Sequence, residues 1–185
     1  MFHRISCMKK FLIGLFILIS LVFIYLISQG LLQSVKVEQR MMPGFRIAGI
    51  RHIGPYEKIG DAFNQIHAVA DEQGVPVKMI GVYFDNPNEV VEDSLRSLAG
   101  IIVSEEDSAK LSVLPNLTFL TIPAGNAAVS NFETAGMVSM IIGAMKSYPT
   151  LTEYVAEKGL AEQVNFVYEV YGEGKTEYVM QMANP

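Results

Sequence analysis

The hydrophobic pattern of the chain is uneven, because one long apolar run near its start is followed by short periodic segments. Residues 11–27, FLIGLFILISLVFIYLI, carry no charge, and with the two residues that follow they can cross the roughly 30 Å core of a bilayer as a helix. A cleavable signal peptide is the alternative, but the run exceeds the usual apolar region of about 7–15 residues and no A-x-A site follows it. We therefore predict a basic segment at 1–10, an uncleaved transmembrane helix at 11–29 and a polar tether at 30–42.

Beyond the tether, the first half of the remaining sequence reads as strand, helix, strand, strand. Residues 45–53, FRIAGIRHI, are typical of a strand. The next segment carries apolar residues on one face at a period of 3.6, which predicts an amphipathic helix that ends at Gly74. These apolar residues are Ile59, Ala62, Phe63, Ile66, Val69 and Ala70. Strands are predicted at 79–84 and 95–103, and the second of them runs into an acidic loop at 105–107.

The second half contains the same kinds of element. Two short strands are predicted at 117–122 and 127–132, and a helix at 137–145 that Pro149 interrupts. A further helical turn is predicted from the capping-box pattern of Thr150 and Glu153 to Gly159, followed by a hairpin of strands at 166–171 and 177–182. A tyrosine stands nine residues after each helix-ending glycine, Tyr83 after Gly74 and Tyr168 after Gly159, which supports a duplication. We therefore predict an α+β fold of duplicated β-α-β-β units that form an antiparallel sheet with two helices on one face, preceded by a single transmembrane helix.

Charge and metal-ligating residues exclude several classes of partner. The part of the chain after the apolar run holds 11 of the 14 basic residues and all 19 acidic ones, a net charge of −8. Such a domain repels nucleic-acid phosphate, so we expect no nucleic-acid partner. The single cysteine, Cys7, precedes the run, and His3, His52 and His67 lack the spacing of metal ligands. We therefore expect no metal site and no cofactor.

Basic residues around the apolar run predict its direction in a membrane. Arg4, Lys9 and Lys10 precede the run, whereas only Lys36 and Arg40 follow it closely. The positive-inside rule then places the N-terminus in the cytoplasm and the domain outside it, in the periplasm if the cell is a Gram-negative bacterium.

Glu169 is the most informative side chain of the domain, because all its neighbours in residues 166–171, FVYEVY, are apolar or aromatic. On a strand it shares a face with Val167 and Tyr171. If that face is buried, the carboxylate must raise its pKa or meet a cation, which suits a receptor for lipophilic cations or a general acid/base. If the face is open to water, Glu169 is an ordinary surface residue, and the pattern alone fits both interpretations.

Tyrosines recur at or beside the predicted strands, at positions 56, 83, 168, 171 and 178. Such a set suits an aromatic-lined pocket, but aromatic residues are common in strands, so core packing is the simpler interpretation. The sequence contains no Ser/His/Asp arrangement with a nucleophile elbow and no phosphate-binding glycine loop.

Four motifs of the domain carry a resemblance to a known family. They are Arg51-His52-Ile53-Gly54-Pro55-Tyr56, Gly81-Val82-Tyr83-Phe84-Asp85-Asn86-Pro87, Ile122-Pro123-Ala124-Gly125 and Tyr168-Glu169-Val170-Tyr171. In this order and spacing, about residues 43–183 resemble the GyrI-like small-molecule-binding domain, which also serves as the effector-binding domain of some multidrug-sensing regulators. We therefore expect residues 43–185 to form such a ligand-binding domain. The resemblance implies a ligand cleft between the two halves, with Glu169 as its carboxylate and Tyr83, Tyr171 and Tyr56 in its lining.

These features favour a binding protein over an enzyme. The leading hypothesis is a membrane-anchored module that holds hydrophobic, cationic or aromatic compounds in a cleft around Glu169. A hydrolase of electrophilic small molecules, with Glu169 as catalytic residue beside a tyrosine, is the first alternative. A membrane-tethered protein-interaction domain is the second.

Overall fold

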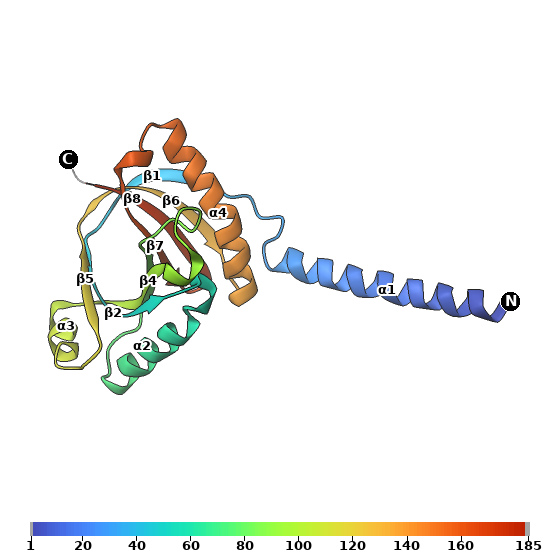
Figure 1. Ribbon diagram of the computed structural model, residues 1–185, viewed down its shortest axis with the longest axis horizontal. Coiled ribbons are helices and arrows are strands. Elements are labelled where there is room, and N and C mark those ends of the chain that lie inside the picture. Colours follow the sequence, from blue (N-terminus) through green and yellow to red (C-terminus); the bar gives the residue numbers. More distant parts are fainter. Residues whose placement is uncertain (1, 184–185) are drawn as a thin grey trace.

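A computed structural model describes residues 2–183, in which one helix extends away from an α+β domain (Figure 1). A short linker joins this helix, α1 (Phe2–Ser28), to the first strand of the domain. Its part from Met8 to Ser28 is long and apolar enough to cross a membrane, and its most apolar stretch is not buried against the rest of the chain. Membrane spans and signal sequences share these properties.

The domain confirms the predicted fold class, because its strands form one antiparallel sheet of eight strands. The strands are β1 (Val37–Met42), β2 (Phe45–Ile53), β3 (Met79–Tyr83), β4 (Arg96–Val103), β5 (Thr118–Ile122), β6 (Gly125–Glu133), β7 (Val164–Gly172) and β8 (Lys175–Met182). The domain helices are α2 (Gly60–Glu72), α3 (Glu105–Leu111) and α4 (Met137–Glu157), with short 3-10 turns at Tyr56–Lys58, Glu92–Ser94 and Ala161–Gln163.

The strand order β1-β6-β8-β7-β3-β4-β2-β5 consists of two halves with the same internal order. In the first half, β1 to β4, the strands β2, β4 and β3 lie side by side, and in the second half, β5 to β8, the equivalent strands β6, β8 and β7 do. The first strand of each half pairs with the outer edge of the other half: β5 pairs with β2, and β1 pairs with β6. The expected tether at 30–42 is therefore too long, because residues 37–42 are β1 and pair along their whole length with β6. The segment is polar because an edge strand exposes one face, and only Met42 is fully buried.

One row of register partners crosses five strands of the sheet: Ala99, Gly81, Glu169, Tyr178 and Ser130. Side chains of directly paired residues point to the same face. α2 packs on Ala99 with neighbouring residues of β4 and β2, and α4 packs on β6 and β8 around Tyr178. Both helices therefore cover this face, as predicted, and the central strands β3 and β7 lie between them (Figure 1).

The opposite face of the sheet is also buried. Val82 and Tyr168 are register partners there, in a cluster that reaches Met42 of β1 and Ile122 of β5. The two edge strands thus contribute to one core, since the sheet curls around it. Tyr168 consequently points away from the face that holds Tyr83, so the matched spacing of these two tyrosines does not reflect equivalent positions.

Two further local predictions are wrong. The acidic residues 105–107 open α3 instead of a loop, because the Ser104 side chain accepts a hydrogen bond from the Asp107 amide at 3.0 Å, and acidic residues favour a helix N-terminus. Pro149 does not interrupt α4, which continues to Glu157. The turn after the proline buries Leu151 against the sheet, and this packing offsets the lost backbone hydrogen bond.

Candidate functional site

Glu169 lies at the centre of the helix-covered face, on β7 between Gly81 of β3 and Tyr178 of β8. The side chain is buried, with 7% of the residue exposed. A strand at the middle of an eight-stranded sheet has no free edge, and α2 and α4 flank the site, which explains why water reaches the carboxylate so little. The interpretation of Glu169 as an ordinary surface residue therefore does not hold.

Both carboxylate oxygens of Glu169 accept hydrogen bonds from tyrosines. The Tyr148 hydroxyl on α4 donates to Oε1 at 2.7 Å, and the Tyr171 hydroxyl donates to Oε2 at 2.6 Å. A third tyrosine, Tyr83 of β3, has its hydroxyl oxygen 3.3 Å from that of Tyr171. One carboxylate and three phenol groups thus form a connected cluster from three elements of the fold, which we call the Glu169 cluster.

The Glu169 cluster has an unusual charge balance. Among the residues whose side chains the structure describes, 8–183, no Lys, Arg or His forms a salt bridge with Glu169. Burial raises the pKa of Glu169 above its ordinary value, and hydrogen bonds from Tyr171, Tyr148 and Tyr83 oppose that rise. Within this described part of the chain, the carboxylate is therefore stabilised by neutral donors and has no salt-bridging countercharge.

The same environment keeps the surrounding phenols neutral. Burial raises the pKa values of Tyr83, Tyr148 and Tyr171 well above their ordinary value, and the negative charge of Glu169 raises them further. These hydroxyls therefore act as hydrogen-bond donors across the physiological pH range. The site presents at most one negative charge, located on Glu169, inside aromatic walls.

Aromatic rings and one glycine shape the space beside the carboxylate. Phe63 of α2 packs edge-on against Tyr171, with ring centroids 5.4 Å apart. A Cβ atom on Gly81 would lie 3.1 Å from the Tyr83 hydroxyl, 3.2 Å from the Phe63 ring and 3.3 Å from the Tyr171 hydroxyl. Because Gly81 has no side chain, these three rings can occupy the space above it on the sheet.

The structure brings together three of the four expected site residues, namely Glu169, Tyr83 and Tyr171. The fourth, Tyr56, packs its ring edge-on against Tyr83 with centroids 4.9 Å apart. Its hydroxyl points elsewhere, because it donates to the Asp85 carbonyl at 2.8 Å and accepts from the Asp85 amide at 3.1 Å. Tyr56 thus supports the wall of the cluster without reaching the carboxylate.

Tyr148 is the member of the cluster that sequence reasoning missed. The predicted helix ends at residue 145, so it does not include Tyr148, and the predicted lining consists of tyrosines at or beside strands. The signal that could have found Tyr148 is its helical spacing, since it lies three and seven residues after Met145 and Ile141.

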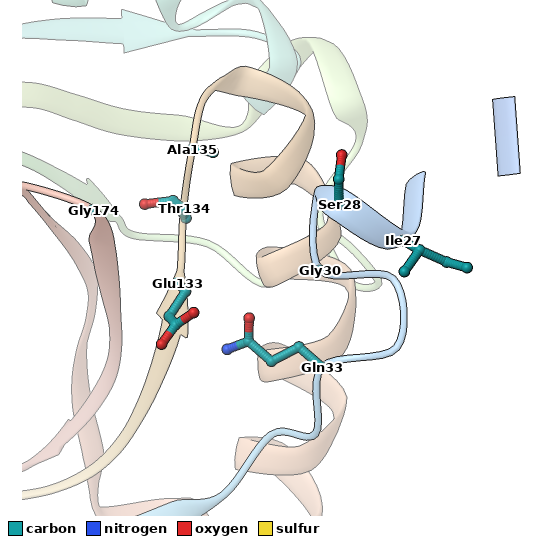
Figure 2. Close-up of a pocket in the computed structure, with 8 residues that line it drawn as sticks. All are labelled: Ile27, Ser28, Gly30, Gln33, Glu133, Thr134, Ala135 and Gly174. Atoms are coloured by element: carbon teal, nitrogen blue, oxygen red, sulfur yellow. The ribbon is translucent and has the colours of Figure 1, made fainter. Parts of the chain in front are cut away.

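Two open hollows lie elsewhere on the molecule, and neither includes Glu169. The first, of about 420 Å³, separates the end of α1 from the segment that leads into α4, and Figure 2 shows the Gln33 and Glu133 side chains facing each other across it. The second, of about 230 Å³, lies beside Arg40 and Glu177. Within the described part of the chain, no group of three His, Cys, Asp or Glu side chains could hold a metal ion.

Comparison with curated proteins finds relatives of two kinds. Testis-expressed protein 264 homolog of Mus musculus is 25% identical over 163 residues, which cover 83% of this chain and 51% of that protein. A DNA gyrase inhibitor of Citrobacter koseri is 36% identical over 92 residues, 49% of this chain and 51% of that protein. The chain thus spans about half the length of these relatives.

Solved structures with the same fold include the following two. The EcmrR C-terminal domain matches with a TM-score of 0.56 and 18% identity over 82% of this chain and 99% of that domain. SAV2435, solved with tetraphenylphosphonium bound, matches with a TM-score of 0.51 and 10% identity over 80% of this chain and 94% of that one. At these identities the likeness concerns the fold. The family model of the GyrI-like small molecule binding domain matches residues 36–181, and the chain belongs to this family.

Proposed function

We propose that this protein is a membrane-anchored module that binds hydrophobic, cationic or aromatic small molecules at the Glu169 cluster. The observation that carries the proposal is a buried carboxylate whose hydrogen-bond partners are neutral tyrosines and which has no salt-bridge partner among the described residues. Burying an ionised carboxylate without a countercharge costs several kcal/mol, roughly, in proteins. A bound cation would supply that countercharge, so the site favours ligands of positive charge.

The walls of the cluster suit the rest of such a ligand. The rings of Tyr83, Tyr171 and Phe63 offer apolar surface and π-faces, which attract organic cations by about 0.5–2 kcal/mol per contact. These rings pack on one another above Gly81, so a bulky ligand must part them as it enters between α2 and α4. The tetraphenylphosphonium held by SAV2435, a lipophilic cation in the same fold, supports this class of ligand.

The anchor part of the proposal rests on α1. Its 21 residues from Met8 to Ser28 are long and apolar enough to cross a membrane, and their most apolar stretch is not buried against the domain. A bilayer would cover this apolar surface. Three basic residues before the run against two after it favour a cytoplasmic N-terminus and an extracytoplasmic domain.

The experiment that tests the proposal compares two ions of equal shape and opposite charge. We would measure thermal unfolding of the full chain in detergent with tetraphenylphosphonium or tetraphenylborate, in the wild type and in Glu169→Gln. We expect only the cation to raise the Tm, and only in the wild type. Equal stabilisation of both variants would show that the carboxylate is not the recognition element.

A hydrolase is the second candidate, favoured by one observation. The raised pKa of Glu169 brings it nearer to neutrality, where a general acid or base works best. A hydrolase would convert the compounds that stabilise it, and Glu169→Gln would abolish turnover while binding persists. If no compound of either charge stabilises the wild type, the third hypothesis, a membrane-tethered protein-interaction domain, takes precedence.

A further inference from the structure

The first half of α4 carries an exposed apolar stripe made of Met137, Ile141 and Met145. These residues are 78%, 54% and 73% exposed, respectively. They are spaced four residues apart, so they lie on one side of the helix, and Tyr148 follows three residues later on the same side. The stripe therefore leads along α4 to the tyrosine that donates to Glu169.

The helix half that carries the stripe also differs in charge from the rest of the domain. Residues 137–149 contain no Asp or Glu, although the chain has 19 of them, and the single charged residue there is Lys146. Its ammonium group points to the linker after α1, where it donates to the backbone carbonyls of Leu31 at 2.7 Å and Gln33 at 2.5 Å. The exposed side of this helix half thus combines apolar side chains with an absence of acidic ones.

The position of the stripe relative to α1 indicates what covers it. Ile27 and Ser28, at the end of the apolar helix, line the same hollow as Thr134 and Ala135, and Ala135 precedes Met137 by two residues (Figure 2). α4 runs across the direction of α1, with its N-terminal end nearest to the end of α1 (Figure 1). If α1 spans a bilayer, the water-facing boundary of that bilayer lies at the start of α4.

We propose that Met137, Ile141 and Met145 dock into the interfacial layer of the same bilayer that α1 crosses. An amphipathic helix lies in this layer with its apolar side chains among the acyl chains. The inference rests on the anchor in the proposed function and adds a second membrane contact, which holds the domain against the lipid surface. It brings the edge of the Glu169 cluster to the lipid phase, where hydrophobic ligands concentrate.

Because the chain contains no tryptophan, a single introduced indole reports its own surroundings. The full chain is reconstituted in phosphatidylcholine vesicles that contain brominated phosphatidylcholine, which quenches nearby indoles. Ile141→Trp probes the stripe. Phe16→Trp probes the anchor. Val113→Trp is the matched control, because Val113 is 81% exposed and follows α3, which lies far from α1 (Figure 1).

We expect blue-shifted and quenched emission at positions 16 and 141, and unquenched emission at position 113. Adding Met137→Glu and Met145→Glu to Ile141→Trp should remove the quenching at 141, because the added carboxylates resist burial in lipid. Quenching that survives these two changes would reflect tethering alone and would contradict docking. Quenching at 16 without quenching at 141 would also contradict it, and quenching at neither position would contradict the anchor as well.

The outcome is independent of ligand binding. Quenching by lipid requires no ligand, whereas stabilisation by tetraphenylphosphonium in detergent requires no bilayer. A failure of one therefore leaves the other standing. The substituted side chains at 137, 141 and 145 are exposed, so the variants should retain the Tm of the wild type in detergent without ligand, and this Tm verifies their fold.

Discussion

Removing the Tyr148 hydroxyl is the sharpest test of the electrostatics at the site. In Tyr148→Phe the ring remains against Tyr178, with which it packs edge-on at 5.7 Å, but Oε1 of Glu169 loses its donor. A hydrogen bond to an ionised group contributes about 1.5–3 kcal/mol, whereas one between neutral groups contributes about 0.5–1.5 kcal/mol. The free energy of unfolding of Tyr148→Phe should therefore fall by about 2 kcal/mol where Glu169 is ionised and by about 1 kcal/mol where it is protonated.

The pH dependence has a defined sign. Burial raises the pKa of Glu169 in the folded chain above its value in the unfolded chain. The resulting contribution to the free energy of unfolding is therefore fully present below the ordinary Glu pKa of about 4.3, and it is lost as the pH rises through the pKa of the folded chain. Without the Tyr148 donor the folded pKa rises further. The difference in stability between wild type and Tyr148→Phe should then widen from acid to alkaline pH.

The assay is thermal unfolding of the full chain in detergent at about pH 4 and pH 8, with Tyr154→Phe as control. Tyr154 lies on the same helix and packs in the core beneath it, outside the Glu169 cluster. For a domain of about 150 residues, 2 kcal/mol corresponds to a Tm shift of about 4–8 °C. A loss that is equal at both pH values, or equal to that of the control, would refute a hydrogen bond to an ionised Glu169.

Three further substitutions or truncations test other parts of the structure. Gly143→Ala should destabilise the domain by about 1–3 kcal/mol in urea denaturation, because the added Cβ would lie 2.5 Å from the Tyr178 hydroxyl and 2.9 Å from the Phe132 ring. Gly60→Ala is the control and should not destabilise the domain, because a Cβ there meets nothing within 4 Å. Gly81→Leu should abolish the stabilisation by tetraphenylphosphonium, because its side chain enters the space beside Glu169; retained stabilisation would place the ligand elsewhere. A fragment that begins at residue 43 lacks β1 and the buried Met42, so it should unfold at lower urea concentration than one that begins at residue 34, and equal midpoints would show that β1 is dispensable.

Much of the fold follows from local pattern. The periodic apolar face of α2 and the strand segments of both halves are visible in the sequence, because burial on one side imposes a period of 3.6 or 2. β1 cannot be predicted from this periodicity, because the sequence of an edge strand with one solvated face resembles that of a polar linker. The continuation of α4 through Pro149 escapes it too, because the stabilising contact of Leu151 with the sheet is tertiary.

The candidate site is predictable only in part, for a similar reason. An isolated carboxylate in an aromatic strand marks Glu169, but whether its face is buried depends on where α2 and α4 pack. The hydroxyl of Tyr148 reaches Glu169 from 21 positions away along the chain, a contact that no spacing rule contains. The exchange of first strands between the halves likewise follows from pairing at long range.

The central claim is that Glu169 recognises a lipophilic cation, and isothermal titration calorimetry of tetraphenylphosphonium tests it most directly. With a charge separation of about 5 Å and an effective dielectric constant of about 20, the carboxylate contributes about 3 kcal/mol, or roughly a hundredfold in Kd. We predict measurable binding to the wild type at about pH 8 and binding weaker by roughly that factor in Glu169→Gln. Equal Kd values for the two proteins would contradict the account.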